Sequence, residues 1–140
     1  MENLKLKDYI SEYYFDQNYN CAETILRASN EYYGFNLHEK DMIMVGAYGG
    51  GMQTGNTCGA ILATAAVLSL KYVEAKAHES ESIKPVMEKM ISKVNEKYGS
   101  LLCADIKHQE FMPEIRCKRT VETVCDILEE TIKEYEAEKI

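Results

Sequence analysis

The chain has 140 residues, of which 46% are apolar and 28% charged, with a net charge of −7 and five cysteines. This composition is typical of a folded protein rather than a disordered one, and the length predicts one domain over residues 1–140. The acidic balance shows no basic footprint of the kind that duplex-binding proteins carry, so we expect no nucleic-acid partner.

Apolar residues recur at helical spacing and no stretch alternates as a strand does, so we predict an all-α fold, a bundle of about five to six helices. The helix expected at about 58–73 is apolar nearly all round, which places it at the centre of the bundle. A capping box at Asn20 and Glu23 starts the second helix, and Thr57 is positioned to cap the central one. The predicted helices cover roughly residues 3–16, 20–34, 37–48, 58–73, 82–98 and 114–138, with a helical turn near 101–107.

The N-terminus lacks an apolar signal segment, and the longest weakly polar run, residues 58–70, is too short to span a bilayer. We therefore expect a cytoplasmic protein without membrane insertion. The five cysteines are widely spaced and form no C-x-x-C motif, which excludes zinc ribbons, thioredoxin-like motifs and c-type haem attachment. Scattered cysteines in a reducing compartment are by default small buried side chains.

Five of the eight glycines lie in residues 46–56, which predicts a loop with several positive φ angles. Gly50-x-x-x-x-Gly55-Asn56-Thr57 has the outline of a phosphate-binding loop, but it lacks the lysine and the preceding strand. The dinucleotide fingerprint also fails, because its third glycine is missing. What remains is a helix N-terminus whose free N–H groups favour an adjacent anion.

Four cysteines are predicted at helix ends or in loops, where backbone donors are within reach. Cys58 opens the central helix, so we expect its pKa to fall and its thiolate to be the most reactive. The alternative is a small residue packed beneath the glycine turn. Cys21 follows an N-cap, Cys103 lies just past a helix end, and Cys117 falls in the first turn of the last helix. Cys125 is mid-helix and is predicted to be core.

The residues around these cysteines resemble the C-GCAxxG-C-C family of redox-active proteins. The similarity keeps its order along nearly the whole chain, through residues 19–22, 48–52, 57–63 and 98–103 to Cys117. One departure is Ala63, which stands where the signature has its last glycine. The resemblance implies a site of four recurrent cysteines, Cys21, Cys58, Cys103 and Cys117, with the glycines Gly49, Gly50, Gly51 and Gly59 around Cys58 as candidate cofactor-binding positions.

Three functions fit these four cysteines. The first is thiol–disulfide or electron-transfer chemistry in which Cys58 is the activated thiolate and another cysteine resolves it, with three pairings open. The second is a metal or iron–sulfur module, for which four thiolates have the right ligand number. A related module fused to a split-Soret haem cytochrome is associated with an iron–sulfur cluster, but this chain has no haem motif. The third is a helical adaptor with buried cysteines.

Other candidate residues add less. His108 follows Cys103 by five residues, a spacing that allows a Cys/His metal site, but an exposed loop histidine is the simpler interpretation. Four tyrosines near the N-terminus indicate either a surface for homo-oligomer formation or a local satellite core: Tyr9, Tyr13, Tyr14 and Tyr19. The redox partner and the substrate are left open by the sequence.

Overall fold

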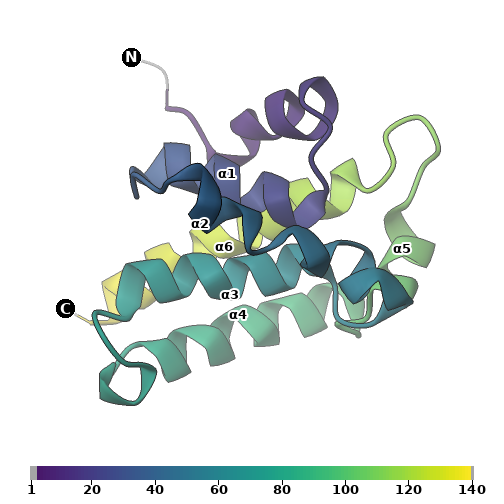
Figure 1. Cartoon of the computed structure of the whole chain (residues 1–140). Coiled ribbons are helices and arrows are strands. Elements are labelled where there is room, and N and C mark those ends of the chain that lie inside the picture. Colours follow the sequence, from purple (N-terminus) through teal and green to yellow (C-terminus); the bar gives the residue numbers. More distant parts are fainter. Residues whose placement is uncertain (1–2, 140) are drawn as a thin grey trace.

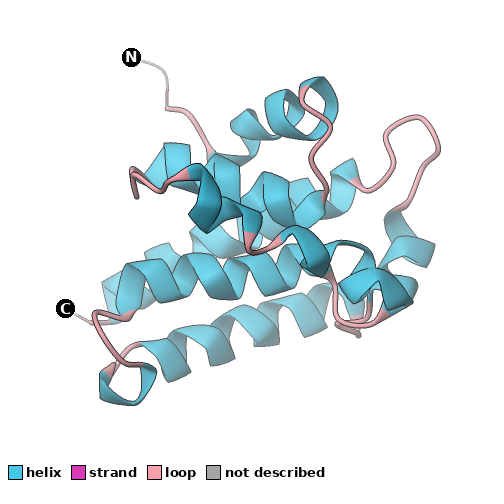
Figure 2. Cartoon of the chain, viewed as in Figure 1, coloured by secondary structure: helices cyan, strands magenta, loops and turns pink. Residues whose placement is uncertain are grey.

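Six α-helices carry the fold in the computed structural model, which describes residues 3–139 (Figure 1). Within these residues Figure 2 shows helices and loops, and the strand-like pairing consists of two isolated bridges. The prediction of an all-α single domain is confirmed. The helices are α1 (Cys21–Tyr33), α2 (Glu39–Ile43), α3 (Gly59–Tyr72), α4 (Ile83–Tyr98), α5 (Cys103–Glu110) and α6 (Lys118–Glu138).

The predicted central helix is confirmed as α3, which packs against α1, α4 and α6. Its apolar sequence has no polar face to turn toward solvent, so burial on several sides is the stable arrangement. Both α3 and its main partner α1 bury alanines, whose small side chains permit a close approach of the two helices. These alanines have no exposed surface: Ala22 and Ala28 in α1, and Ala60 and Ala63 in α3.

The N-terminal segment is helical but not the single α-helix expected over 3–16. It forms a 3-10 turn at Leu6–Tyr9 and a wider π turn at Glu12–Asp16. The carbonyl of Tyr14 accepts a hydrogen bond at 3.3 Å from the side chain of Arg116, which lies far along the chain. The π turn replaces the regular i to i−4 ladder, and Arg116 supplies a donor to one of the carbonyls within it.

The third predicted helix, 37–48, is shorter than expected. Only α2 is α-helical there, and a 3-10 turn at Gly46–Tyr48 follows it. Asn36 does not cap α2, because its φ of 60° puts it in the left-handed region that asparagine tolerates. The cap is His38, whose backbone N–H donates to the carboxylate of Asp41 at 3.1 Å.

The second half of the chain follows the predicted helices closely. Ser82 occupies the N-cap position of α4 without a side-chain capping hydrogen bond, and Gly99 ends the helix with a left-handed φ of 69°. The last helix begins at Lys118 rather than near Glu114, because residues 112–116 form a tight hairpin whose bridge pairs Met112 with Arg116. Further helical turns occur at Gly51–Gly55 and Ala77–Glu79.

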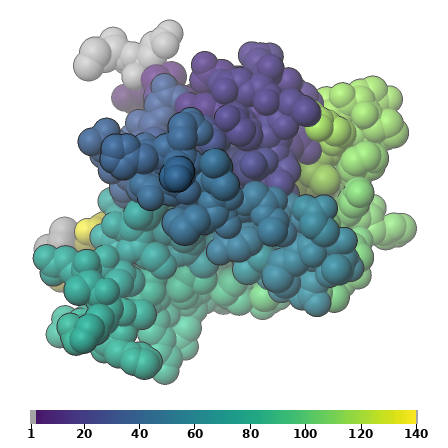
Figure 3. Space-filling model, in the orientation of Figure 1, coloured from purple at the N-terminus to yellow at the C-terminus, as the bar shows by residue number. Residues whose placement is uncertain are grey.

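One end of the bundle gathers segments that are far apart in sequence. In Figure 1, α5 and the glycine segment lie together at the right-hand end, opposite the end marked C. In Figure 3, the yellow-green connection from α5 to α6 lies against the purple N-terminal segment. Among residues 3–139, none of the helices combines the length and apolar character that crossing a membrane requires.

Candidate functional site

All four family-motif cysteines lie at helix N-termini and line one cavity of about 160 Å³. Cys21 is the first residue of α1 and Cys103 the first of α5, whereas Cys58 and Cys117 are the N-caps of α3 and α6. The fold thus brings together four helix ends that the sequence spaces widely. The other lining residues are Tyr14, Asn20, Gly50, Ile106, Lys107, Arg116 and Thr120.

A short antiparallel contact turns Cys58 and Cys103 toward the same side. The N–H of Cys58 donates to Leu101 at 2.8 Å, and the N–H of Cys103 donates to Asn56 at 2.6 Å. Between these two bonds Thr57, which was expected to cap α3, pairs with Leu102. Because successive extended residues point to opposite sides, the two cysteines face inward while Leu102 is 42% exposed.

The glycine loop is shaped by close contacts with the cysteines. Gly51 has a φ of +65°, and a Cβ there would lie 2.7 Å from the Cβ of Cys103. Gly59 opens α3, where a Cβ would lie 2.5 Å from the carbonyl oxygen of Tyr48 and 3.0 Å from the sulfur of Cys21. Glycine at these two positions lets backbone and thiols approach more closely than a side chain permits.

Asn20 joins the start of α1 to the glycine loop. Its side-chain oxygen accepts from the N–H of Glu23 at 2.9 Å, which confirms the predicted cap. Its side-chain nitrogen donates to the carbonyl of Gly46 at 3.0 Å, and a Cβ on Gly49 would overlap that nitrogen. Gly49 therefore permits the close packing against Asn20. Burial raises the pKa of the neighbouring Cys21, and the N–H of Gly50 lowers it by less.

Replacing Asn20 with alanine is expected to lower the free energy of unfolding by about 1–2 kcal/mol, because the cap and the hydrogen bond to the loop are both lost. Urea unfolding followed by circular dichroism measures this change. Asn95→Ala is a matched control on the exposed surface of α4, with an expected effect within about 0.5 kcal/mol. Equal losses in the two variants would contradict the role given to Asn20.

The expected fall in the pKa of Cys58 is wrong. Burial raises the pKa of this thiol, which is 5% exposed, and the N–H groups of Ala60 and Ile61 lower it by less. Burial likewise raises the pKa of Cys21 to about 12. The helix N-terminus does supply donors, but the desolvation of a thiolate in this cavity outweighs them. The sequence could not show this, because burial arises from the tertiary fold.

The remaining electrostatics distinguish Cys117 from the deeper thiols. Burial raises its pKa, and negative charge on Cys103 adds to the rise, whereas Lys107 and Arg116 both lower it. The backbone N–H of Cys117 donates to the hydroxyl of Tyr14 at 3.1 Å. Cys117 is also partly exposed, and the two cations line the same cavity.

Sequence reasoning missed Tyr14, Lys107 and Arg116 as residues of the site. Two of the three had a local signal. Arg116 directly precedes a motif cysteine. Lys107 follows Cys103 by four residues, which places Cys103 and Lys107 on one face of a helix. Tyr14 had none, because its contact with Cys117 joins residues 103 positions apart.

Unfolding at alkaline pH tests the burial of the thiols. Above its ordinary pKa of 9.0 the thiol of Cys21 ionises in the unfolded chain, whereas the folded protein keeps the proton until about 12. The folded state binds more protons over this range, so the free energy of unfolding should fall from pH 9 toward 12 and stay level below 9 in respect of this group. Urea unfolding at pH 8 and 10.5 should show a smaller fall for Cys21→Ser than for the unmodified protein. An identical fall in both would contradict the burial of this thiol.

The other candidate ligands lie outside the cavity. Cys125 has no exposed surface within α6, which confirms its prediction as core. His108 is exposed, as expected, but it lies in α5 rather than in a loop, and it does not line the cavity. Over residues 3–139, no group of three or more His, Cys, Asp or Glu side chains is placed to hold a metal ion.

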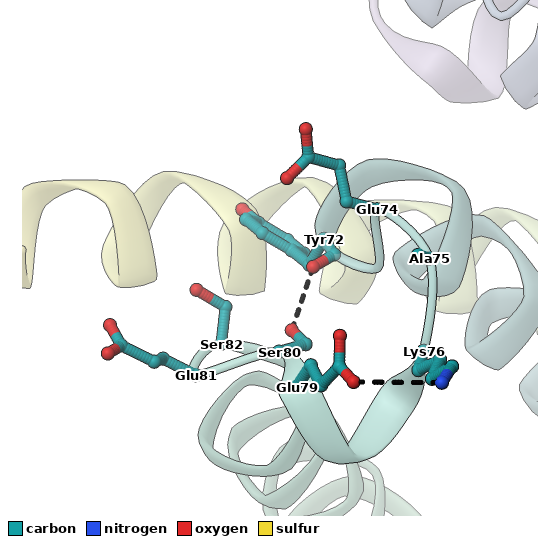
Figure 4. Close-up of a pocket in the computed structure, with 8 residues that line it drawn as sticks. All are labelled: Tyr72, Glu74, Ala75, Lys76, Glu79, Ser80, Glu81 and Ser82. Carbon is teal, nitrogen blue, oxygen red and sulfur yellow. Dashed lines mark hydrogen bonds and ion pairs between the residues drawn. The ribbon is translucent and has the colours of Figure 1, made fainter.

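A larger cavity, of about 630 Å³, lies at the connection from α3 to α4 (Figure 4). There the hydroxyl of Ser80 donates to the carbonyl of Tyr72 at 2.7 Å, and Lys76 pairs with Glu79 at 3.9 Å. No cysteine or histidine lines this cavity, so we place the redox chemistry in the smaller cavity that the four cysteines line.

The comparisons with known proteins agree with the four-cysteine arrangement. Residues 19–131 match a family described as putative redox-active proteins (C_GCAxxG_C_C). The searches of curated proteins and of solved structures gave no match. The matched range contains all four cysteines of the cavity and spans most of the chain. The protein therefore belongs to the C_GCAxxG_C_C family.

Proposed function

We propose that Cys21, Cys58, Cys103 and Cys117 form one thiol–disulfide redox centre. The observation that carries this proposal is that four separate helix N-termini bring these thiols to one cavity. Two thiols that can approach each other give up two electrons and two protons when they close a disulfide, and exchange with another disulfide is the usual route. Membership of a redox-active family supports the same chemistry.

The outer pair in this proposal is Cys103 and Cys117, both of which are partly exposed. Cys21 is also partly exposed, but burial raises its pKa to about 12, and Cys58 is buried. In the proposed reaction the thiolate of Cys117 attacks one sulfur of a substrate disulfide, forming a mixed disulfide and releasing one substrate thiolate. The thiolate of Cys103 then attacks the Cys117 sulfur and releases the second. Two electrons pass from the protein to the substrate, and the two thiol protons are taken up by the released thiolates.

Cys21 and Cys58 form the inner pair. The sulfur of Cys21 lies against Gly59, the residue that follows Cys58. Burial is the main cause that raises the pKa of Cys21, and negative charge on Cys58 adds to the rise. These thiols pass electrons to the outer pair by internal exchange, because Cys58 is buried and the raised pKa of Cys21 keeps that thiol protonated near neutral pH.

Thiol counting in a graded redox buffer tests the centre. Equilibration with 2-hydroxyethyl disulfide and its thiol should remove thiols in pairs, without dimer formation, and a dithiol reductant should restore all five. Cys125→Ser is the control and should lower every count by one without changing the pairwise loss. Retention of all thiols until the chain unfolds would reject the proposal and favour a helical adaptor with buried cysteines.

An iron–sulfur or other metal centre is the second candidate. Four cysteines around a cavity without a lining carboxylate have the ligand number of a cluster, which would supply one-electron transfer when bound. In the described residues, however, the thiols are not placed to hold a metal ion, so they would have to approach one another. Iron and acid-labile sulfide analysis after anaerobic purification tests this candidate, with stoichiometric iron in its favour and none against it.

A further inference from the structure

We infer that the redox centre selects negatively charged disulfides and thiols as its substrates, an inference that rests on the proposed function. The residues that line the cavity include two cations, Lys107 and Arg116, and no aspartate or glutamate. A cavity of one sign of charge attracts substrates of the opposite sign and raises their local concentration.

This positive cavity stands out in an acidic protein. Residues 42–70, which include the glycine loop, carry no charged side chain, and residues 101–119 carry four Lys or Arg against three Asp or Glu. Because the net charge of the whole chain is −7 and residues 101–119 contribute +1, the residues outside these two segments have a net charge of −8. Anionic substrates would be repelled elsewhere on such a surface, so attraction at the cavity gives selectivity as well as affinity.

The carboxylates nearest in sequence, Asp105, Glu110 and Glu114, form no ion pair with either cation in the part of the chain that the structure describes. Glu114 is exposed. Glu110 is buried, accepts from the hydroxyl of Tyr98 at 2.8 Å and lies 3.7 Å from Arg119. Asp105 accepts from the hydroxyl of Ser100 at 2.7 Å. Across residues 3–139, neither cavity cation forms an ion pair.

Aromatic rings hold both cations in place. The guanidinium of Arg116 lies 4.5 Å from the ring centroid of Tyr14 and donates to that residue's carbonyl. The ammonium of Lys107 lies 5.0 Å from the ring of Phe111. Each cation keeps further N–H donors, which can bind a carboxylate or sulfonate on the substrate.

Each outer thiol has one of these cations as a neighbour along the chain. Arg116 directly precedes Cys117, and Lys107 lies one helical turn after Cys103 in α5. An anionic group close to a substrate disulfide would therefore meet a cation while its sulfur faces a thiol. The same cations favour the attacking thiolate, so one arrangement serves both recognition and reactivity.

Three aliphatic disulfides of different charge test this selectivity: the dianion 3,3′-dithiodipropionate, neutral 2-hydroxyethyl disulfide and the dication cystamine. Rates with the reduced protein are divided by the rates with a neutral peptide thiol, which removes differences in intrinsic reactivity. We expect the order dianion, neutral, dication, with a span on the order of tenfold or more at low salt. The span should shrink as ionic strength rises.

Variants assign the selectivity to the two cations. Lys107→Gln combined with Arg116→Gln should bring the three normalised rates together, and Arg116→Lys should retain most of the order. Lys40→Gln, at an exposed position on α2, is the matched control and should keep the full order. Equal normalised rates or a preference for cystamine in the unmodified protein would overturn the inference but leave the proposed function standing. Absence of reaction with all three disulfides would reject both.

Discussion

Cys117→Ser is expected to lower the rate of exchange with substrate disulfides by roughly 100-fold or more, because a serine hydroxyl is not ionised near neutral pH and cannot replace the attacking thiolate. Cys103→Ser should have a different consequence. Attack by Cys117 still occurs, but the resolving thiol is absent, so the mixed disulfide accumulates. Intact-protein mass spectrometry detects this adduct as the protein plus one half of the substrate.

The control for both variants is Cys125→Ser, which removes a thiol from the core of α6 and none from the cavity. Its exchange rate should match that of the unmodified protein once its fold is verified by circular dichroism. Accumulation of the adduct in Cys117→Ser rather than in Cys103→Ser would reverse the assigned roles. Equal rates in all three variants would remove Cys103 and Cys117 from the reaction.

Gly59→Ala is expected to disturb both the fold and the site. The added methyl group would lie 2.5 Å from the Tyr48 carbonyl oxygen and 3.0 Å from the Cys21 sulfur, so α3 must shift away from the glycine loop and α1. Overpacking of this kind costs about 1–3 kcal/mol. The shift also moves Cys58 relative to Cys21, so disulfide formation within the inner pair should slow. Urea unfolding and thiol counting measure the two effects.

Gly46→Ala provides the comparison, because it adds the same methyl group where the nearest atom, a carboxylate oxygen of Glu23, lies at an ordinary 3.6 Å. Gly46 also has no positive φ, so alanine adopts its conformation without strain. Its expected change in the free energy of unfolding is within about 0.5 kcal/mol. If Gly59→Ala were as mild as Gly46→Ala, the close approach of α3, the loop and Cys21 would be contradicted.

The fold was largely predictable where local chemistry and tertiary packing agree. Asn20 caps α1, as the sequence indicated, and Gly34 and Gly99 end α1 and α4 in the left-handed conformation that glycine adopts readily. The all-apolar segment became the central helix for the same reason. The predictions were less accurate where distant residues determine the backbone. The N-terminal segment contacts Arg116, and the hairpin at 112–116 delays the start of α6.

The four cysteines of the candidate site could be predicted from the sequence, but their burial and the charges around them could not. Helix ends and the family resemblance pointed to the four cysteines that line the cavity. The expected activation of Cys58 was wrong, because a local argument accounts for backbone donors and not for burial by other elements. Lys107 and Arg116 likewise gain importance only once α5 and the hairpin bring them to the thiols.

The most direct test of a shared redox centre is to map the disulfides formed as the protein is oxidised in steps. The protein would be equilibrated at a series of potentials and alkylated, and its peptides would be identified by mass spectrometry. The four-thiol centre predicts a first disulfide between Cys103 and Cys117 and a second between Cys21 and Cys58, with Cys125 reduced throughout. Disulfides between different chains, or no disulfide among the four cavity cysteines at any potential, would contradict it.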